Sequence, residues 1–321
     1  MRLVAERLER GRLLPLTLGQ PAAAIWARVA RPERELRLPA RARVVGVGGA
    51  TLGGSGCTPL AIAVAESLAQ SGERVAFVSH GYRASWRRWR QVEITDSAAL
   101  VGDEALLAAR RLAAHGVSVS IGPRRQAIER ASHEAGVVVV DGLLQTRPVR
   151  LAYSILSVDQ NAPWGAGHCP PRGDLRAQPD RLLAAADVVC AIDCGDPCAE
   201  RSPQILRVPA RSTLLGFDGQ RSWGQLHGRR VGVVLAIARP QRVLAQLARR
   251  GVTPVVVRLA ADHGRPSTRP GDRQRVDVWL TTEKCFTKLG WRLAGREVWC
   301  LRQELDLPGQ LLSGALRTRD F

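Results

Sequence analysis

A glycine-rich turn between an apolar run and an amphipathic segment restricts the fold of this chain more than any other feature. Residues 43–48 (RVVGVG) read as a buried strand, and residues 58–72 (TPLAIAVAESLAQSG) read as a helix ended by glycine. Between them, residues 48–56 contain five glycines. Such a turn suits phosphate, because small residues let backbone N–H groups approach an anion and the start of a helix favours negative charge. The stretch therefore predicts a nucleotide-binding loop in an α/β fold.

The loop differs from the usual Walker A pattern at two positions. Thr51 stands where the first glycine is expected, and Cys57 stands where a lysine contacts the phosphates. Thr58 keeps the hydroxyl that binds Mg²⁺, and Pro59 suits the first turn of a helix. We predict that the nucleotide is bound by Gly53, Gly54, Ser55, Gly56, Cys57 and Thr58.

Short apolar runs alternate with amphipathic segments from residue 43 onward. The runs are continuously apolar, as in parallel strands that helices cover on both faces. Together with the glycine-rich loop, this alternation predicts a P-loop NTPase-like, doubly wound and mostly parallel sheet. The pattern lapses near residues 216–228, and a second alternating set then predicts a smaller α/β domain. The apolar runs include residues 74–79, 117–122, 137–142 and 187–193 in the first set and 229–238, 253–259, 276–282 and 297–302 in the second.

Three parts of the chain differ in character. Residues 1–40 mix leucine, alanine and a tryptophan with arginines, residues 41–225 hold the P-loop domain, and residues 226–321 form the smaller C-terminal α/β domain. A basic amphipathic segment such as residues 1–40 either associates with an anionic membrane or packs on the domain, and both alternatives stay open. No apolar run reaches the roughly 18 residues of a spanning helix. No secretory signal is recognised, so we expect a cytoplasmic location.

The net charge of +18 suggests an anionic partner. Only Lys284 and Lys288 are lysines, so arginine supplies 45 of the 47 basic residues, and high-GC codon usage is an equal explanation of the excess. Two tyrosines and four phenylalanines leave few side chains for base stacking, which disfavours a nucleic-acid partner. Seven cysteines, an odd number, indicate reduced thiols.

Several motifs, in order along residues 43–289, resemble those of the tetraacyldisaccharide 4'-kinase family of lipid A synthesis. The glycine-rich loop is similar to the family pattern N-[LI]-[ST]-x-G-G-T-G-K-T-P, in which a serine or threonine also stands at the position of Thr51. The other matching stretches are FVSHGYR (77–83), VGDEALLAARR (101–111), VVVDGLLQTR (138–147), GAGHCPPRGDLR (165–176), LAIARPQRV (235–243), ADHGRPST (261–268) and TTEKCFTKL (281–289).

The resemblance implies an activity and its setting. Residues 41–225 would be a P-loop kinase-like domain that transfers the γ-phosphoryl group of ATP, with Mg²⁺, to the 4'-hydroxyl of tetraacyldisaccharide 1-phosphate, the lipid A disaccharide precursor. The chain would be a peripheral monomer on the anionic surface of the bacterial inner membrane, at its cytoplasmic face. Such a reaction needs positioning and charge neutralisation more than covalent chemistry.

The family's functional positions imply roles for individual residues. Asp103 matches the catalytic base and His263 its partner, although Asp103 read alone would more often be the N-cap of a helix. Asp141 and Thr58 match ligands of Mg²⁺, and the end of a strand is where α/β sheets place functional groups. Two more matching residues, Arg176 and Tyr82, are predicted to contact phosphate or substrate.

Departures from the family pattern gather around the nucleotide. Cys57 removes a cation, Val140 removes one of two adjacent carboxylates, and Gly264 replaces a second histidine. Cys285 replaces an aspartate, and Gln145 is displaced by an apparent insertion. The cations considered as replacements for the lysine are Arg83, Arg87 and Lys284. These departures leave an alternative, a catalytically silent homologue that binds the lipid precursor or a protein partner at the membrane.

Overall fold

The computed structural model describes residues 41–143, 153–193 and 205–316. The predicted membrane-associating segment, residues 1–40, lies outside the described residues, as does Gln145. Within them, no helix is both long enough and apolar enough to cross a membrane.

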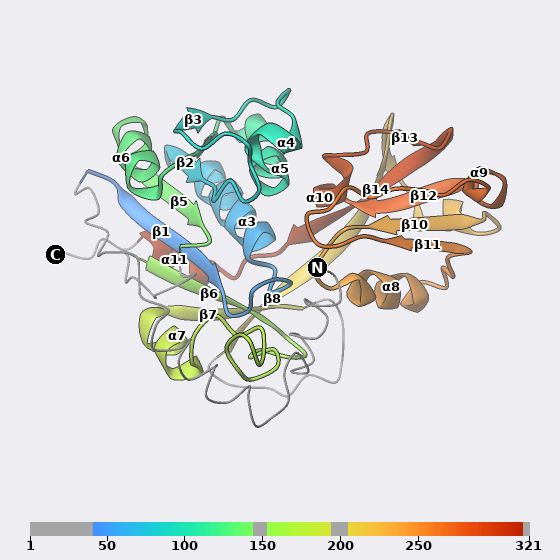
Figure 1. Ribbon diagram of the computed structural model, residues 1–321. Coiled ribbons are helices and arrows are strands. Elements are labelled where there is room, and N and C mark those ends of the chain that lie inside the picture. Colours follow the sequence, from blue (N-terminus) through green and yellow to red (C-terminus); the bar gives the residue numbers. More distant parts are fainter. Residues whose placement is uncertain (1–40, 144–152, 194–204, 317–321) are drawn as a thin grey trace.

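The first half of the chain forms a mostly parallel sheet between two layers of helices (Figure 1). Strand β1 lies in the middle and pairs in parallel with β5 on one side and β6 on the other. Its strands are β1 (Arg43–Gly49), β2 (Val75–Val78), β3 (Arg90–Gln91), β4 (Ser118–Ile121), β5 (Val137–Asp141), β6 (Tyr153–Asp159) and β7 (Val188–Asp193). Its helices are α3 (Cys57–Gln70), α4 (Ala98–Val101), α5 (Asp103–Leu112), η1 (Ala113–His115), α6 (Arg124–Glu134) and α7 (Pro179–Ala185).

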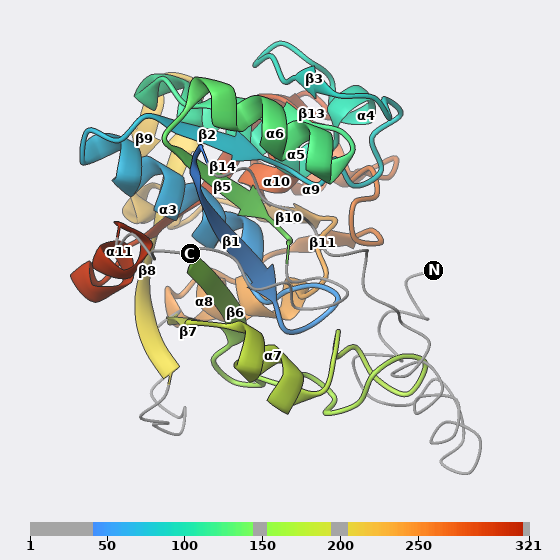
Figure 2. The ribbon, with the colours of Figure 1, turned by 90° about the vertical axis from the view of Figure 1, so that its left-hand side faces the viewer.

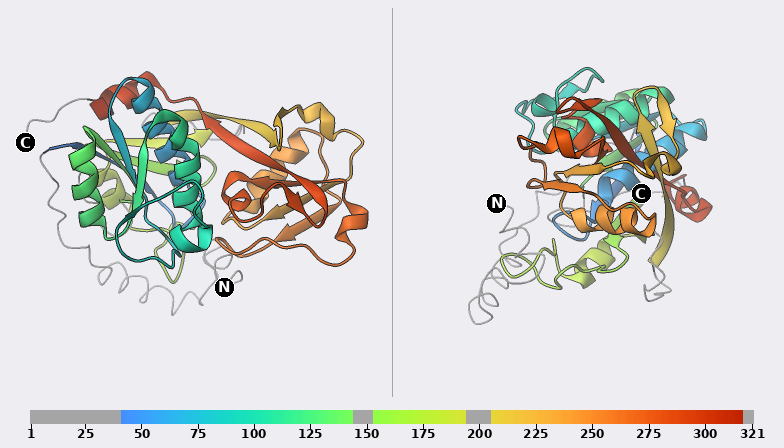
Figure 3. Two further views of the ribbon diagram at one scale, coloured as in Figure 1. Left: turned by 90° about the horizontal axis from the view of Figure 1, so that it is seen from above. Right: turned by 90° about the vertical axis from the view of Figure 1, so that its right-hand side faces the viewer.

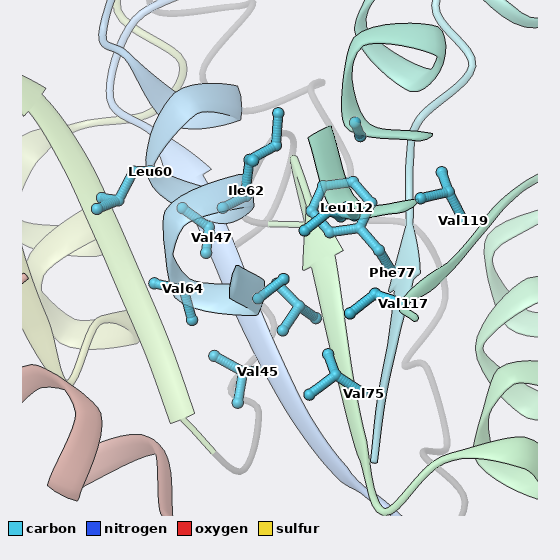
Figure 4. Close-up of a cluster of buried hydrophobic side chains, with 14 of the residues drawn as sticks. Val45, Val47, Leu60, Ile62, Val64, Val75, Phe77, Leu112, Val117 and Val119 are labelled. Atoms are coloured by element: carbon cyan, nitrogen blue, oxygen red, sulfur yellow. The ribbon is translucent and has the colours of Figure 1, made fainter. Parts of the chain in front are cut away.

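Alternate side chains of these strands enter two separate cores, which explains their continuously apolar sequences. Val45, Val47 and Phe77 pack with α3 and α5 in the larger core (Figure 4). Val44 and Val140 point to the opposite face and pack under α6. The predicted P-loop NTPase-like, mostly parallel fold is confirmed.

The second half continues the same sheet, so that the strand order is β11-β10-β12-β14-β8-β7-β6-β1-β5-β2-β4-β3. Its strands are β8 (Ile205–Gly216), β9 (Gly219–Arg221), β10 (Val231–Leu235), β11 (Val256–Leu259), β12 (Val278–Thr282), β13 (Arg292–Leu293) and β14 (Arg296–Leu305). Its helical segments are η2 (Trp223–Leu226), α8 (Pro240–Arg249), α9 (Asp272–Arg275), α10 (Glu283–Phe286) and α11 (Gly309–Leu316).

Two long strands connect the halves. The first residues of β8 pair in parallel with β7, and its later residues pair antiparallel with β14. Seen from above, β8 and β14 run from one half to the other (Figure 3, left). Helix α11 then returns to the first half, beside β8 (Figure 2), where Leu311 and Ala315 enter the larger core. The boundary near residue 225 stays a prediction, since β8 and α11 tie both halves together.

Candidate functional site

The glycine-rich loop joins the end of β1 to the start of α3, as the sequence predicts. Gly54 and Gly56 have φ angles of 74° and 77°, a left-handed conformation that side chains rarely adopt. A Cβ at Gly56 would also lie 2.3 Å from Cδ1 of Ile192. The first turn of α3 contains no acidic residue. The loop therefore has the backbone geometry of an anion site, and no acidic side chain in the first turn of α3 opposes the binding of an anion at the start of that helix.

A second segment, residues 174–176, is hydrogen-bonded to this loop and brings Arg176 next to it. Thr51 forms an isolated antiparallel bridge with Leu175. The backbone N–H of Leu52 donates to the carbonyl of Asp174 at 2.8 Å, and that of Arg176 donates to the carbonyl of Ala50 at 2.9 Å. The Arg176 side chain donates from Nε to the carbonyl of Thr51 at 2.7 Å. The guanidinium thus lies beside the loop although its residue is 125 positions away.

Cys57 is a neutral thiol that binds Asp141. Its Sγ lies 3.1 Å from Oδ1 of Asp141 and 3.1 Å from the carbonyl oxygen of Val47, so its single S–H is shared between these two acceptors. Burial, followed by the charge and hydrogen bond of Asp141, raises the pKa of the Cys57 thiol well above its ordinary range. The thiol therefore supplies no charge where a lysine would be positive.

We expect the half-buried, protonated thiol of Cys57 to react slowly. Alkylation by iodoacetamide at pH 8 should be at least about tenfold slower in the folded chain than in guanidinium, because only the thiolate is nucleophilic. Peptide mass spectrometry would follow Cys57 apart from the other cysteines. Equal rates in the folded and unfolded chain would contradict the placement of the thiol against Asp141.

Asp141 and Thr58, the two predicted Mg²⁺ ligands, lie in contact. Burial raises the pKa of Asp141 to about 6, the charge of Glu104 adds to this rise, and hydrogen bonds from Cys57 and Thr58 oppose it. Mg²⁺ usually takes one or two protein carboxylates and completes its shell with water and substrate phosphates. One hydroxyl and one carboxylate beside the loop fit that requirement. Val140 packs under α6, so its side chain faces away from Asp141.

Asp103 and His263 come together from the two halves of the chain. Nδ1 of His263 lies 2.8 Å from Oδ1 of Asp103, and Lys288 donates from Nζ to Oδ2 of Asp103 at 2.5 Å. Burial alone would raise the pKa of Asp103, but the hydrogen bond from His263 and the charge of Lys284 outweigh it and hold the pKa well below its usual range. The N-cap alternative is wrong, because α5 begins at Asp103 and its N-cap position is occupied by Gly102, which has no side chain that could cap it.

Lys284 fixes the tautomer of His263. Its Nζ lies 3.1 Å from Nε2 of His263 and donates to Asp262 at 3.0 Å and Glu104 at 3.2 Å. Because an ammonium group only donates, Nε2 accepts and Nδ1 carries the proton that binds Asp103. Burial would lower the pKa of Lys284, but the charges of Glu104, Asp262 and Asp103 outweigh it and raise the pKa. Lys284 is therefore committed to these partners.

Tyr82 and the remaining cations complete the surroundings of the pair. The Tyr82 ring meets the His263 ring edge-on, with centroids 4.7 Å apart. Arg83 is exposed and donates to the carbonyl of Asp262 at 3.3 Å, and Arg87 is exposed. The positive charge of Arg176 acts on both Cys57 and Asp141, where it lowers the pKa of each group.

Two arginines at the start of α8 also reach the loop, and sequence reasoning missed them. Arg242 donates from Nη1 to the carbonyl of Gly54 at 2.7 Å, and both Arg239 and Arg242 pair with Asp159. Arg239 also binds Asp174 at 3.2 Å. The signal was in the ARPQR stretch and in an aspartate that ends β6, a position where α/β sheets place functional groups.

Comparison with known proteins assigns the family. The chain matches the tetraacyldisaccharide-1-P 4'-kinase family over residues 13–319. The chain belongs to this family. A tetraacyldisaccharide 4'-kinase of Anaeromyxobacter dehalogenans strain 2CP-1 is 34% identical over 307 residues, covering 86% of this chain and 79% of that protein. One of Legionella pneumophila strain Corby is 32% identical over 213 residues, covering 65% of this chain and 64% of that protein.

The chain also shares its fold with a solved structure. LpxK of Aquifex aeolicus, described in complex with ATP, superposes with a TM-score of 0.68 at 20% identity, covering 92% of this chain and 96% of that one. The family is one of phosphotransferases, so the predicted family and enzyme class are confirmed.

Proposed function

We propose that the chain transfers the γ-phosphoryl group of ATP to the 4'-hydroxyl of tetraacyldisaccharide 1-phosphate. The observation that carries this proposal is the contact of Asp103 with His263 and Lys288, which both come from the other half of the chain. Glu104, the next residue, has its charge acting on Asp141 and Cys57, so the start of α5 faces the nucleotide loop. This arrangement supports a general base at Asp103 next to a phosphate site at the loop.

The residues divide the work of phosphoryl transfer. Backbone N–H groups of the loop bind the phosphates, and Asp103 accepts the proton of the sugar hydroxyl. His263 holds one oxygen of Asp103 and leaves the other to Lys288. Thr58 and Asp141 would hold Mg²⁺, which neutralises phosphate charge when bound. Tyr82, whose ring meets that of His263 edge-on, would border the acceptor sugar.

Arg176 is our proposed replacement for the missing lysine. Its Nε holds the loop at Thr51, and its charge acts on Cys57 and Asp141. Lys284 has three partners of its own, which disfavours it.

We expect Arg176→Gln to lower kcat/KM for ATP by about a hundredfold or more, as loss of a charged phosphate contact does in related reactions. Arg172→Gln, on the same segment, is the matched control. The double variant Cys57→Lys with Arg176→Gln should recover part of the loss, because the lysine returns a cation to the loop. A native value in Arg176→Gln would refute the role of Arg176.

The alternative of a silent homologue has one observation in its favour. Cys57 occupies Asp141 with a neutral hydrogen bond and brings no charge to the loop. Cys285 carries less weight, because its buried sulfur accepts the N–H of Ala236 and so has a packing role.

The proposed cellular location follows from the substrate. A tetraacylated disaccharide resides in a bilayer, so we propose a peripheral monomer at the cytoplasmic face of the bacterial inner membrane, on its anionic surface.

The direct test is product formation. The purified chain, MgATP and detergent-dispersed tetraacyldisaccharide 1-phosphate should give a product heavier by one phosphate, with the new ester at the 4'-position by phosphorus NMR. No product above that of an Asp103→Asn variant would reject the activity and favour the silent homologue.

A further inference from the structure

Residues 82–95 form a mostly exposed segment between β2 and α4, around β3 at the top of Figures 1 and 2. Among the described residues, eight large hydrophobic side chains are exposed, and three of them lie in this segment. They are Tyr82, Trp86 and Ile94, with exposed fractions of 48%, 43% and 52%. Single exposed apolar residues are normal, whereas a cluster in one short segment calls for a partner.

The same segment is basic. It contains four arginines and one acidic residue, Glu93. Arg87 and Arg88 are exposed beside Trp86. Arg90 instead binds both carboxylate oxygens of Asp96 at 2.8 Å and lies over the Trp86 ring, 5.8 Å from its centroid. The charge that remains for a partner is therefore positive and sits next to the exposed indole.

The fold holds these side chains outward. The backbone N–H of Trp86 donates to the carbonyl of Leu100 at 3.1 Å, which fastens the segment to α4. Arg110 of α5 donates to the carbonyl of Ile94 at 3.2 Å. The exposed apolar groups thus belong to an anchored surface.

We propose that this segment docks the chain on anionic phospholipid headgroups, separately from residues 1–40. Trp86 and Ile94 would enter the interfacial region, where amphipathic aromatic side chains concentrate, and Arg87 and Arg88 would contact lipid phosphates. The aliphatic Ile94 favours a lipid partner over nucleic acid, since it offers no face for base stacking.

The surface lies next to the catalytic pair. Tyr82, at one end of the segment, contacts His263. The backbone carbonyl of Tyr82 also packs on Gly102, the residue before Asp103: a Cβ added at Gly102 would lie only 2.9 Å from that carbonyl oxygen. Docking at residues 82–95 would therefore bring a bilayer lipid to Asp103 headgroup first. This part of the inference rests on the proposed function, and the docking itself does not.

The test is sedimentation of the full chain with vesicles of phosphatidylcholine containing phosphatidylglycerol, compared with phosphatidylcholine alone. The triple variant Trp86→Ser, Arg88→Gln, Ile94→Ser should bind the anionic vesicles at least about tenfold more weakly than the native chain. The matched control is Phe217→Ser, Val255→Ser, Arg275→Gln, which removes an aromatic, an aliphatic and a positive exposed side chain from the second half. It should bind as the native chain does. Circular dichroism of each variant checks the fold.

Two further readouts separate the hypotheses. Phosphorylation of detergent-dispersed substrate should be unchanged in the triple variant, and absence of activity in the native chain would reject the proposed function while leaving the vesicle result valid. Native vesicle affinity in the triple variant would overturn the docking surface. Loss of RNA binding in that variant with unchanged vesicle binding would overturn it too and assign the segment to nucleic acid.

Discussion

Asp103→Asn is expected to lower the phosphorylation rate about a thousandfold, within the range for loss of a general base. The amide keeps the shape of the side chain but cannot accept the hydroxyl proton. In the native chain the hydrogen bond from His263 and the charge of Lys284 hold the pKa of Asp103 well below its usual range, so the side chain is a carboxylate at neutral pH. The KM for ATP should change little, because the proposed role of Asp103 is to act on the acceptor hydroxyl and not on the nucleotide. The measurement is kcat for detergent-dispersed substrate at saturating MgATP.

The control for this variant is Asp277→Asn. Asp277 pairs with Arg230 at 2.7 Å on the exposed side of the second half, so its loss removes a paired carboxylate away from the site. It should retain native kcat. If Asp103→Asn had the same kcat as this control, Asp103 would not be the catalytic base.

Cys57→Lys should raise kcat/KM for ATP by about a hundredfold, since a charged contact to the transferred phosphoryl group is worth at least that much in related reactions. The Cys57 thiol already points at Oδ1 of Asp141, so an ammonium group there would form an ion pair. It would lower the pKa of Asp141 from its raised value of about 6 and favour the ionised form, which is the form that would bind Mg²⁺. Steady-state rates at varied MgATP measure the gain.

Cys57→Ala serves as its control, because it removes the thiol without adding charge. It should not exceed the native rate. If Cys57→Lys also failed to gain, the missing lysine would not limit this enzyme, and Arg176 would already supply the whole of its contribution.

Local pattern was enough to predict the loop and the sheet. Glycines at positions that need a left-handed backbone, and valines that alternate between two buried faces, leave a direct trace in the sequence. The motif resemblance also named Asp103 and His263 as partners, and the structure places them 2.8 Å apart. Their catalytic roles stay predictions.

Contacts between the halves could not be predicted in this way. Lys288 binds Asp103, and Arg239 binds Asp159, only because β8 and β14 set one half against the other. No local pattern records that placement. The continuation of the sheet through β8 was missed for the same reason, because a single strand changes partners along its length.

Cys285 was misleading in another way. It replaces an aspartate of the family pattern, and the sequence therefore suggested the loss of a charged group near the nucleotide. Its sulfur is fully buried and accepts a backbone N–H from Ala236. A sequence shows which residue is absent, whereas the environment decides what the new residue does.

Calorimetric titration of the native chain with MgATP tests the central claim most directly, because a kinase whose loop lacks the lysine must still bind its nucleotide. We predict saturable binding of one MgATP per chain, weakened in Arg176→Gln and tightened in Cys57→Lys. No binding by the native chain, with binding recovered in Cys57→Lys, would contradict the account and mark Cys57 as the residue at which the activity was lost.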